Sequence, residues 1–188
     1  AAENSGIVFR RTDLAGEQSR PIKLVPELIN DTRLSSTIVT EDGVRVGTIE
    51  HLMSALAAYG IDNVLIELNA PEIPIMDGSS LPFLYLLQDA GIVDQKAEKR
   101  FLRILKPVEV QEPGKWVRFT PYDGFKVNLT INFDHPVFNR SNPTFEIDFA
   151  GASYVEEIAR ARTFGFMQEV EMMRPHGLGL GGNLSNAV

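Results

Sequence analysis

Apolar positions in the first half of the chain follow two different periods. Between Thr48 and Gly60 they recur every three or four residues, which predicts a helix with Thr48 as its N-cap and Gly60 directly after its end. The apolar positions of this helix are Ile49, Leu52, Met53, Leu56 and Tyr59. A second helix is expected from about residue 82 to 90, between a turn at 77–80 and Gly91.

Shorter apolar and β-branched stretches predict strands. The turn signal Glu41-Asp42-Gly43 predicts a hairpin between two of them. Pro71 and Pro74 exclude a helix from residues 71–76, which we expect to be extended. The strands predicted in this half are 6–11, 35–40, 44–46 and 63–68.

The second half begins after a charged stretch, residues 96–100, that is expected to connect two domains. Asp123-Gly124 is a hairpin signal, and helices are expected at 153 to about 162 and at 165–173. The strands predicted here are 101–107, 115–120, 125–133 and 144–149. The order of elements indicates an α+β fold of two layers built alike, which we assign to domains 1–98 and 99–188.

Composition narrows the class of protein. The chain has 188 residues, 44% hydrophobic and 23% charged, as in ordinary globular domains. Its net charge of −7 argues against a general nucleic-acid binder, and it has no cysteine for disulfides or zinc knuckles. No apolar run is long enough to predict a transmembrane segment. The chain starts at Ala1 without a signal-peptide pattern, and we expect that both ends are truncated.

Glu50 and His51 are the first candidate for chemistry, because they place a carboxylate beside an imidazole in the first turn of a helix. Imidazole is a good Zn²⁺ ligand, and a carboxylate beside the metal can take a proton from bound water. The alternative is a glutamate favoured by the helix dipole next to an incidental histidine. The other two histidines, His135 and His176, have no spacing that joins them to His51.

Three further segments allow both a functional and a structural interpretation. Thr163 lies near Gly165, and its hydroxyl can donate a hydrogen bond to an oxyanion; the alternative is a helix end with two core phenylalanines. Residues 177–182 hold four glycines without a phosphate-loop pattern, which leaves flexible backbone beside a ligand channel or a plain loop. For residues 71–79 we favour a structural role.

Together these segments resemble the UDP-3-O-acyl-N-acetylglucosamine deacetylase family, which commits Gram-negative bacteria to lipid A synthesis. The resemblance implies two similar α+β domains, each a sheet layered with helices, with the helices packed between the two sheets. It also implies hydrolysis of the 2-acetamido group of a UDP-linked, 3-O-acylated glucosamine to acetate and a free amine. The segments that carry the resemblance are 47–52, 59–63, 70–79 and 159–167.

The resemblance assigns roles residue by residue. It makes His51 a ligand of a catalytic Zn²⁺, Glu50 the general base and Thr163 a donor to the tetrahedral oxyanion. Phe164 is expected to form a wall of the substrate site. A hydrophobic passage for the acyl chain is expected to include Phe166, Met167, Val170 and Gly182.

Several residues of the family pattern are not found in this sequence. The remaining zinc ligands, in a His-Lys-x-x-Asp segment, and a later histidine acting as general acid have no counterpart here. We therefore expect this chain alone to be inactive, and a non-catalytic acyl-chain-binding fragment is the alternative function. A non-metal hydrolase has no supporting Ser, His and Asp grouping. We expect the protein to be cytoplasmic and monomeric. The UDP-linked acylated glucosamine substrate is its one expected partner.

Overall fold

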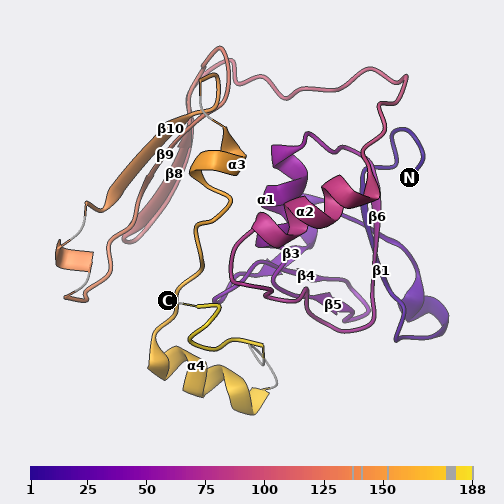
Figure 1. Ribbon diagram of the computed structural model, residues 1–188, viewed down its shortest axis with the longest axis horizontal. Coiled ribbons are helices and arrows are strands. Elements are labelled where there is room, and N and C mark those ends of the chain that lie inside the picture. The colour runs from indigo at the N-terminus through magenta and orange to yellow at the C-terminus, as the bar shows by residue number, and fades with distance from the viewer. Residues whose placement is uncertain (137, 141, 152, 177–180, 188) are drawn as a thin grey trace. The chain divides into compact units, whose positions relative to one another are not determined.

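A computed structural model of the chain describes residues 1–136, 138–140, 142–151, 153–176 and 181–187. The chain forms two compact units, of which unit 1 comprises Ala1–Glu98 with Ile158–Val188 and unit 2 comprises Lys99–Glu157 (Figure 1). Short sheets combined with helices confirm the predicted α+β class. The division into domains 1–98 and 99–188, and the packing of helices between two sheets, remain predictions.

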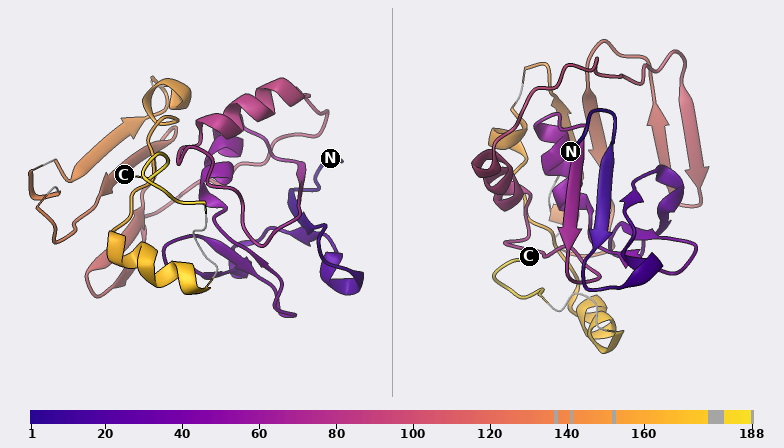
Figure 2. Two further views of the ribbon diagram at one scale, coloured as in Figure 1. Left: turned by 60° about the horizontal axis from the view of Figure 1, so that its bottom comes forward. Right: turned by 90° about the vertical axis from the view of Figure 1, so that its right-hand side faces the viewer.

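Unit 1 contains two three-stranded sheets. In the first, β1 (Ile7–Arg11) lies between a parallel neighbour, β6 (Val64–Leu68), and an antiparallel one, β2 (Ile22–Lys23), as the right panel of Figure 2 shows for β1 and β6. The second sheet has the antiparallel order β3-β4-β5. Its strands are β3 (Ile29–Asp31), β4 (Thr37–Val39) and β5 (Arg45–Val46).

The strand predictions for this unit hold in part. The hairpin expected around Gly43 is β4–β5, and Gly43 has the left-handed φ of +82° that its turn needs. The strands expected at 6–11 and 63–68 are β1 and β6. The sequence did not indicate β2 or β3, because each is only two or three residues long.

The two predicted helices of unit 1 are α1 (Glu50–Ala58) and α2 (Leu81–Ala90), which pack against each other. Gly60 and Gly91 follow them with positive φ, as their predicted role at the helix ends requires. A further helix, α4 (Met167–Met173), confirms the one expected at 165–173. Short 3₁₀ turns complete the unit at Gly16–Ser19, Pro26–Leu28 and Arg174–His176. Of the helices described, the longest has only 10 residues, which falls short of a bilayer crossing.

The core of unit 1 joins both sheets to α1 and α2. Fully buried side chains come from β1, β4, β5, α1 and α2, and burying each large one contributes about 1.5–3 kcal/mol. The most deeply buried of them are Phe9, Ile38, Val46, Leu56 and Leu84.

Two predicted features of the helices are wrong. Thr48 does not cap α1, because its Oγ1 donates a hydrogen bond of 2.6 Å to Glu72 Oε1 instead. The helix expected from 153 to about 162 is limited to α3 (Tyr154–Glu157). Beyond α3 the Ala159 carbonyl accepts a hydrogen bond of 3.0 Å from the Leu81 amide at the start of α2. Because this carbonyl is already bonded to α2, the helix does not continue through residue 159.

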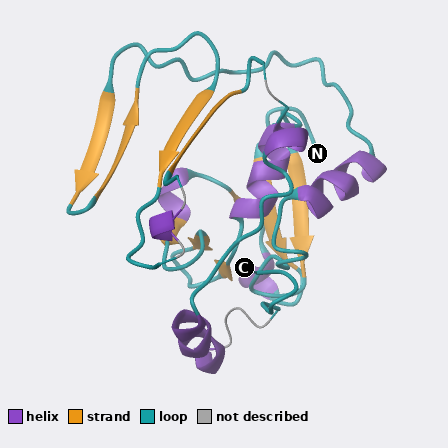
Figure 3. Ribbon diagram, turned by 60° about the vertical axis from the view of Figure 1, so that its left-hand side comes forward, coloured by secondary structure: helices purple, strands orange, loops and turns teal. Residues whose placement is uncertain are grey.

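Unit 2 consists mainly of two separate hairpins, shown as strand pairs in Figure 3. A Pro113-Gly114 turn, with Gly114 at φ +77°, closes the first hairpin. The strand expected at 101–107 is wrong, because this turn pairs Glu112 with Lys115 and the strand before it covers residues 108–112. Asp123-Gly124 does not close a hairpin, since residues 126–130 pair with residues 144–148. The elements are β7 (Val108–Glu112), β8 (Lys115–Phe119), β9 (Lys126–Thr130), β10 (Thr144–Asp148) and a 3₁₀ turn at Phe138–Arg140.

Candidate functional site

The segment before α1 is fixed by two long-range backbone pairings. Gly47 forms an isolated parallel bridge with Glu72, through its amide to the Pro71 carbonyl at 2.8 Å and its carbonyl to the Ile73 amide at 3.0 Å. The amide of the buried Ile49 then donates to the Ser36 carbonyl at 3.2 Å. Residues 47–49 are therefore held between the 71–73 segment and the residues before β4.

Glu50 is the first residue of α1 and is half-buried. Its Oε2 accepts a hydrogen bond of 2.9 Å from the Ser36 amide. Oε1 makes no hydrogen bond within the described residues. Glu50 therefore has one carboxylate oxygen anchored at the helix N-terminus, and its second oxygen has no hydrogen bond among the described residues.

His51 follows Glu50 in α1 and is also half-buried. An imidazole is a usual ligand of catalytic zinc, which generally has three protein ligands. Within the described residues no group of three or more His, Cys, Asp or Glu side chains could hold a metal ion. The described residues therefore offer one candidate donor for Zn²⁺, His51, and do not form a complete metal site.

Thr163 lies in a segment that runs beside the start of α2. Its amide donates to the Gly78 carbonyl at 2.7 Å, and its side chain is half-buried. Two residues of the α2 start, Ser80 through Oγ and Leu81 through its amide, donate to the Ala159 carbonyl at 3.3 and 3.0 Å. Among the described contacts, no hydrogen bond joins Thr163 to Glu50 or His51.

The residues predicted for the acyl passage lie at the start of α4 and near the chain end. The rings of Phe164 and Phe166 meet edge to face with centroids 6.1 Å apart. The Phe166 amide donates to Glu169 Oε2 at 3.3 Å, which anchors the first turn of α4. Met167 and Val170 follow in this helix, the first exposed and the second half-buried, and Gly182 is half-buried. Residues 177–180 of the predicted glycine-rich segment lie outside the described residues.

A hollow in unit 2 contains none of these residues. It is lined by residues at the start of the unit and after β8, namely Arg103, Ile104, Leu105, Pro121, Tyr122 and Asp123. It therefore gives no support to the predicted site.

Comparison with known proteins identifies the family. A family model described as UDP-3-O-acyl N-acetylglycosamine deacetylase matches residues 1–188. The chain belongs to this deacetylase family. It is 83% identical over 188 residues to the UDP-3-O-acyl-N-acetylglucosamine deacetylase of Neisseria meningitidis serogroup B, and covers 61% of that relative's length. The proteins of the same name from Chromobacterium violaceum and Methylococcus capsulatus are 62% and 53% identical, over the same share of their lengths.

Membership of the deacetylase family confirms the resemblance that was based on residues 47–52, 59–63, 70–79 and 159–167. All of this chain matches, but it spans only 61% of the length of these relatives. The roles of individual residues in the family reaction therefore remain proposals.

Sequence reasoning missed the residues that hold the deacetylase candidates in place. Ser36 anchors Glu50, Glu72 accepts from Thr48, and Gly78 accepts from Thr163. Glu72 and Gly78 lie in the segment 71–79 that was interpreted as structural. The turn composition of Asp77-Gly78-Ser79 was a signal for a rigid corner, but nothing in the sequence indicated which distant segments it would meet.

Proposed function

We propose that the protein containing this chain hydrolyses the 2-acetamido group of UDP-3-O-acyl-N-acetylglucosamine in a zinc-dependent reaction of lipid A biosynthesis. The observation that carries this proposal is the match of the whole chain to the deacetylase family at up to 83% identity. The geometry adds support, because Glu50 lies at a helix N-terminus with one carboxylate oxygen anchored and the other available.

In this reaction Glu50 accepts a proton from the attacking water while the water oxygen bonds to the acetamide carbon. His51 would hold one position of a zinc ion, which would supply a Lewis acid that lowers the pKa of water and polarises the carbonyl. The Thr163 hydroxyl donates a hydrogen bond to the oxyanion of the tetrahedral intermediate. The C–N bond then breaks, and a proton passes to the leaving nitrogen, which gives acetate and the free amine.

The substrate's acyl chain is proposed to lie against apolar side chains near α4. Phe164 and Met167 are large, apolar and partly exposed, as a lipid contact requires. The same exposure is what favours the second candidate, an acyl-chain-binding fragment without chemistry. The proposal places the enzyme in the cytoplasm as a monomer.

Acetate release by the full-length protein tests the function. Purified protein is assayed with the acylated UDP-sugar, then after chelation and after addition of Zn²⁺. We expect turnover that is lost on chelation and restored by zinc. Binding of the acylated substrate without acetate release would favour the second candidate instead.

A further inference from the structure

Asn186 is buried, with only 7% of the residue's surface exposed, and both polar atoms of its side chain are hydrogen-bonded. Its Oδ1 accepts from the Asn183 amide at 2.8 Å. Its Nδ2 donates to the Gly181 carbonyl at 2.8 Å and to the Met76 carbonyl at 3.3 Å. A buried amide with three partners fixes the turn at 183–186 and ties it to a segment more than a hundred residues away in sequence.

Gly78 meets the same turn from the other side. It has φ +85°, and a Cβ built on it would lie 1.6 Å from the Asn186 carbonyl oxygen. Glycine is therefore required here for two reasons, the left-handed backbone and the close approach of Asn186. The carbonyl of Gly78 is the group that accepts the Thr163 amide at 2.7 Å.

The corner between these contacts is rigid. Asp77 Oδ1 accepts from both the amide and the hydroxyl of the buried Ser79, at 2.9 and 2.7 Å. The Gly78 amide donates to the Ile75 carbonyl at 2.9 Å, and Met76 is held at φ +55°. A non-glycine residue in this conformation persists only where its surroundings determine it. We therefore expect this corner to pass a shift of Asn186 on to Gly78.

We propose that Asn186 is a positioning residue that clasps the turn at 183–186 onto the corner at 76–78 and, through Gly78, sets the place of Thr163. This inference rests on the proposed function, in which the Thr163 hydroxyl stabilises the oxyanion. The clasp also holds the backbone next to Gly182, at the end of the glycine-rich segment. One side chain therefore links the acyl-passage backbone to the oxyanion donor.

The first test compares Asn186→Asp with Asn183→Asp in the full-length protein. Asn186→Asp keeps the acceptor but removes both N–H donors and places a carboxylate against two carbonyls. Asn183 acts chiefly as an acceptor, since its Oδ1 receives the Ser185 amide at 2.8 Å, so Asn183→Asp is the matched control. We expect Asn186→Asp to lower kcat by about 10- to 100-fold, as for a displaced catalytic group, and Asn183→Asp to leave kcat within about twofold.

Hydrogen exchange of the Thr163 amide supplies a readout that does not depend on activity. We expect Asn186→Asp to speed this exchange at least about tenfold, because the hydrogen bond that protects the Thr163 amide would be weakened. Gly78→Ala should do the same by displacing the Asn186 carbonyl. Gly43→Ala is its control, because Gly43 has φ +82° but open space around its Cβ position.

The outcomes separate this inference from the proposed function. A wild-type protein without acetate release contradicts the deacetylase proposal, while amide exchange still decides whether the clasp exists. The clasp is overturned if the Thr163 amide exchanges at the wild-type rate in folded Asn186→Asp protein. It is also overturned if the controls Asn183→Asp and Gly43→Ala speed this exchange as much as Asn186→Asp does. Faster exchange with unchanged kcat overturns the positioning role. If Asn186→Asp does not fold, Asn186→Ser, which keeps one donor, is measured in its place.

Discussion

Thr48 has a backbone conformation that β-branched residues rarely adopt, and it stands two residues before Glu50. Its φ is +56°, a conformation that costs on the order of 1–3 kcal/mol. The bond from its hydroxyl to Glu72 and the pairing of Gly47 with the 71–73 segment offset this cost. The sharp bend at Thr48 lets α1 begin at Glu50. The strained residue Thr48 thus lies just before the helix turn that carries the proposed base.

Replacing Glu50 by glutamine tests the proposed base. Glutamine keeps an oxygen that can accept from the Ser36 amide, so the fold should be retained. It cannot take a proton, so kcat of the full-length enzyme should fall by about 10²- to 10⁴-fold. Zinc content should stay nearly unchanged, and Glu67→Gln on β6 serves as control. Near-normal kcat with full zinc would exclude Glu50 as the base; a lower melting temperature with catalysis kept would make it a structural anchor.

Replacing His51 by alanine tests the metal ligand. Removing one of three expected protein ligands should lower zinc occupancy and acetate release together. Metal analysis and kinetics on one preparation of the full-length enzyme measure both quantities. His135→Ala, in unit 2, is the control and should retain zinc. Full zinc content in the His51→Ala enzyme would contradict the assignment.

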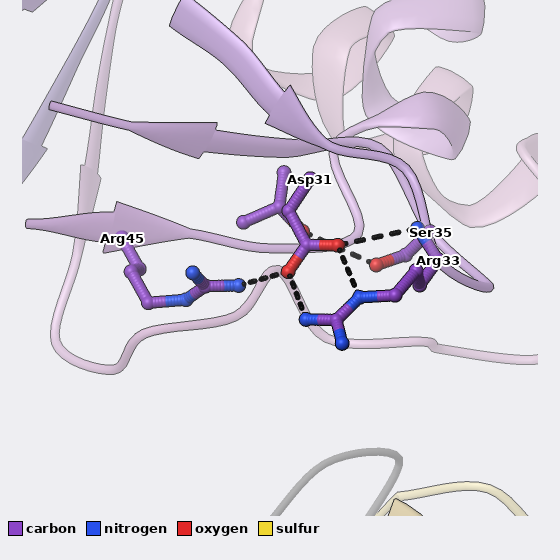
Figure 4. Close-up of polar contacts among 5 residues, drawn as sticks. Asp31, Arg33, Ser35 and Arg45 are labelled. Carbon is purple, nitrogen blue, oxygen red and sulfur yellow. Dashed lines mark hydrogen bonds and ion pairs between the residues drawn. The ribbon is translucent and has the colours of Figure 1, made fainter.

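At the scale of elements, Asp31 links two strands of one sheet. Its carboxylate receives bonds from Arg33, in the loop after β3, and from Arg45 Nη2 on β5 at 2.7 Å (Figure 4). These hydrogen bonds hold the pKa of Asp31 well below its ordinary value, and the bonds from Arg33 have a larger effect than the bond from Arg45. Arg33 is almost fully exposed and lies only two residues from Asp31 in the chain. Arg45 comes from another strand and should therefore matter more for joining the strands.

Acid should weaken this sheet. Since the pKa of Asp31 is depressed in the folded state, its contribution is present above the unfolded value of about 3.9 and is lost as pH falls below it. In urea unfolding of the chain, the Asp31→Asn variant should have a lower free energy of unfolding than wild type at pH 7. The difference between the two free energies should be smaller at pH 3. Arg45→Gln should cost more stability than Arg33→Gln. A gap that is independent of pH would show that Asp31 acts without its charge.

Helix α4 presents two apolar side chains at a spacing of three residues. Met167 and Val170 therefore lie on one face, which is the proposed contact for the acyl chain. In the full-length enzyme, Val170→Trp should raise KM for a long-chain substrate more than for a deacylated analogue. Gln168→Trp introduces the same bulk at a neighbouring exposed position and should discriminate less. Equal effects of Val170→Trp on both substrates would remove this face from the passage.

Elements were predictable where local signals decide them. Helical spacing followed by Gly60 and Gly91 placed α1 and α2, and the Glu50–His51 pair was recognisable in the first turn of α1. Errors arose where a distant segment decides the outcome. The 153–162 helix was predicted too long because the Ala159 carbonyl is used by residues of α2. For the same reason the sequence around Ser36 and Asn186 did not indicate that these residues bond to Glu50 and to Met76.

At the scale of the whole molecule, apolar burial is uneven between the two units. Within the described residues, Ile147 is the one buried hydrophobic side chain of unit 2, whereas unit 1 has a continuous core. The β7–β8 hairpin is amphipathic, and its apolar face of Val108, Val110, Val117 and Phe119 is exposed. A two-stranded hairpin with no cover is marginally stable in water, so unit 2 should exchange its amides faster than unit 1.

Residues 1–188 as an isolated polypeptide should lack a complete zinc site. They include only three histidines, and the described residues bring no three metal-binding side chains together. Catalytic zinc usually needs three protein ligands, so we expect the isolated polypeptide to bind zinc poorly and to release no acetate. Intact mass and metal analysis, with the full-length enzyme as positive control, measure both. An isolated polypeptide that refolds, binds zinc stoichiometrically and turns over substrate would show that other residues of these 188 complete the site. A folded, zinc-free polypeptide that still binds a fatty acyl chain would separate substrate contact at α4 from chemistry at α1.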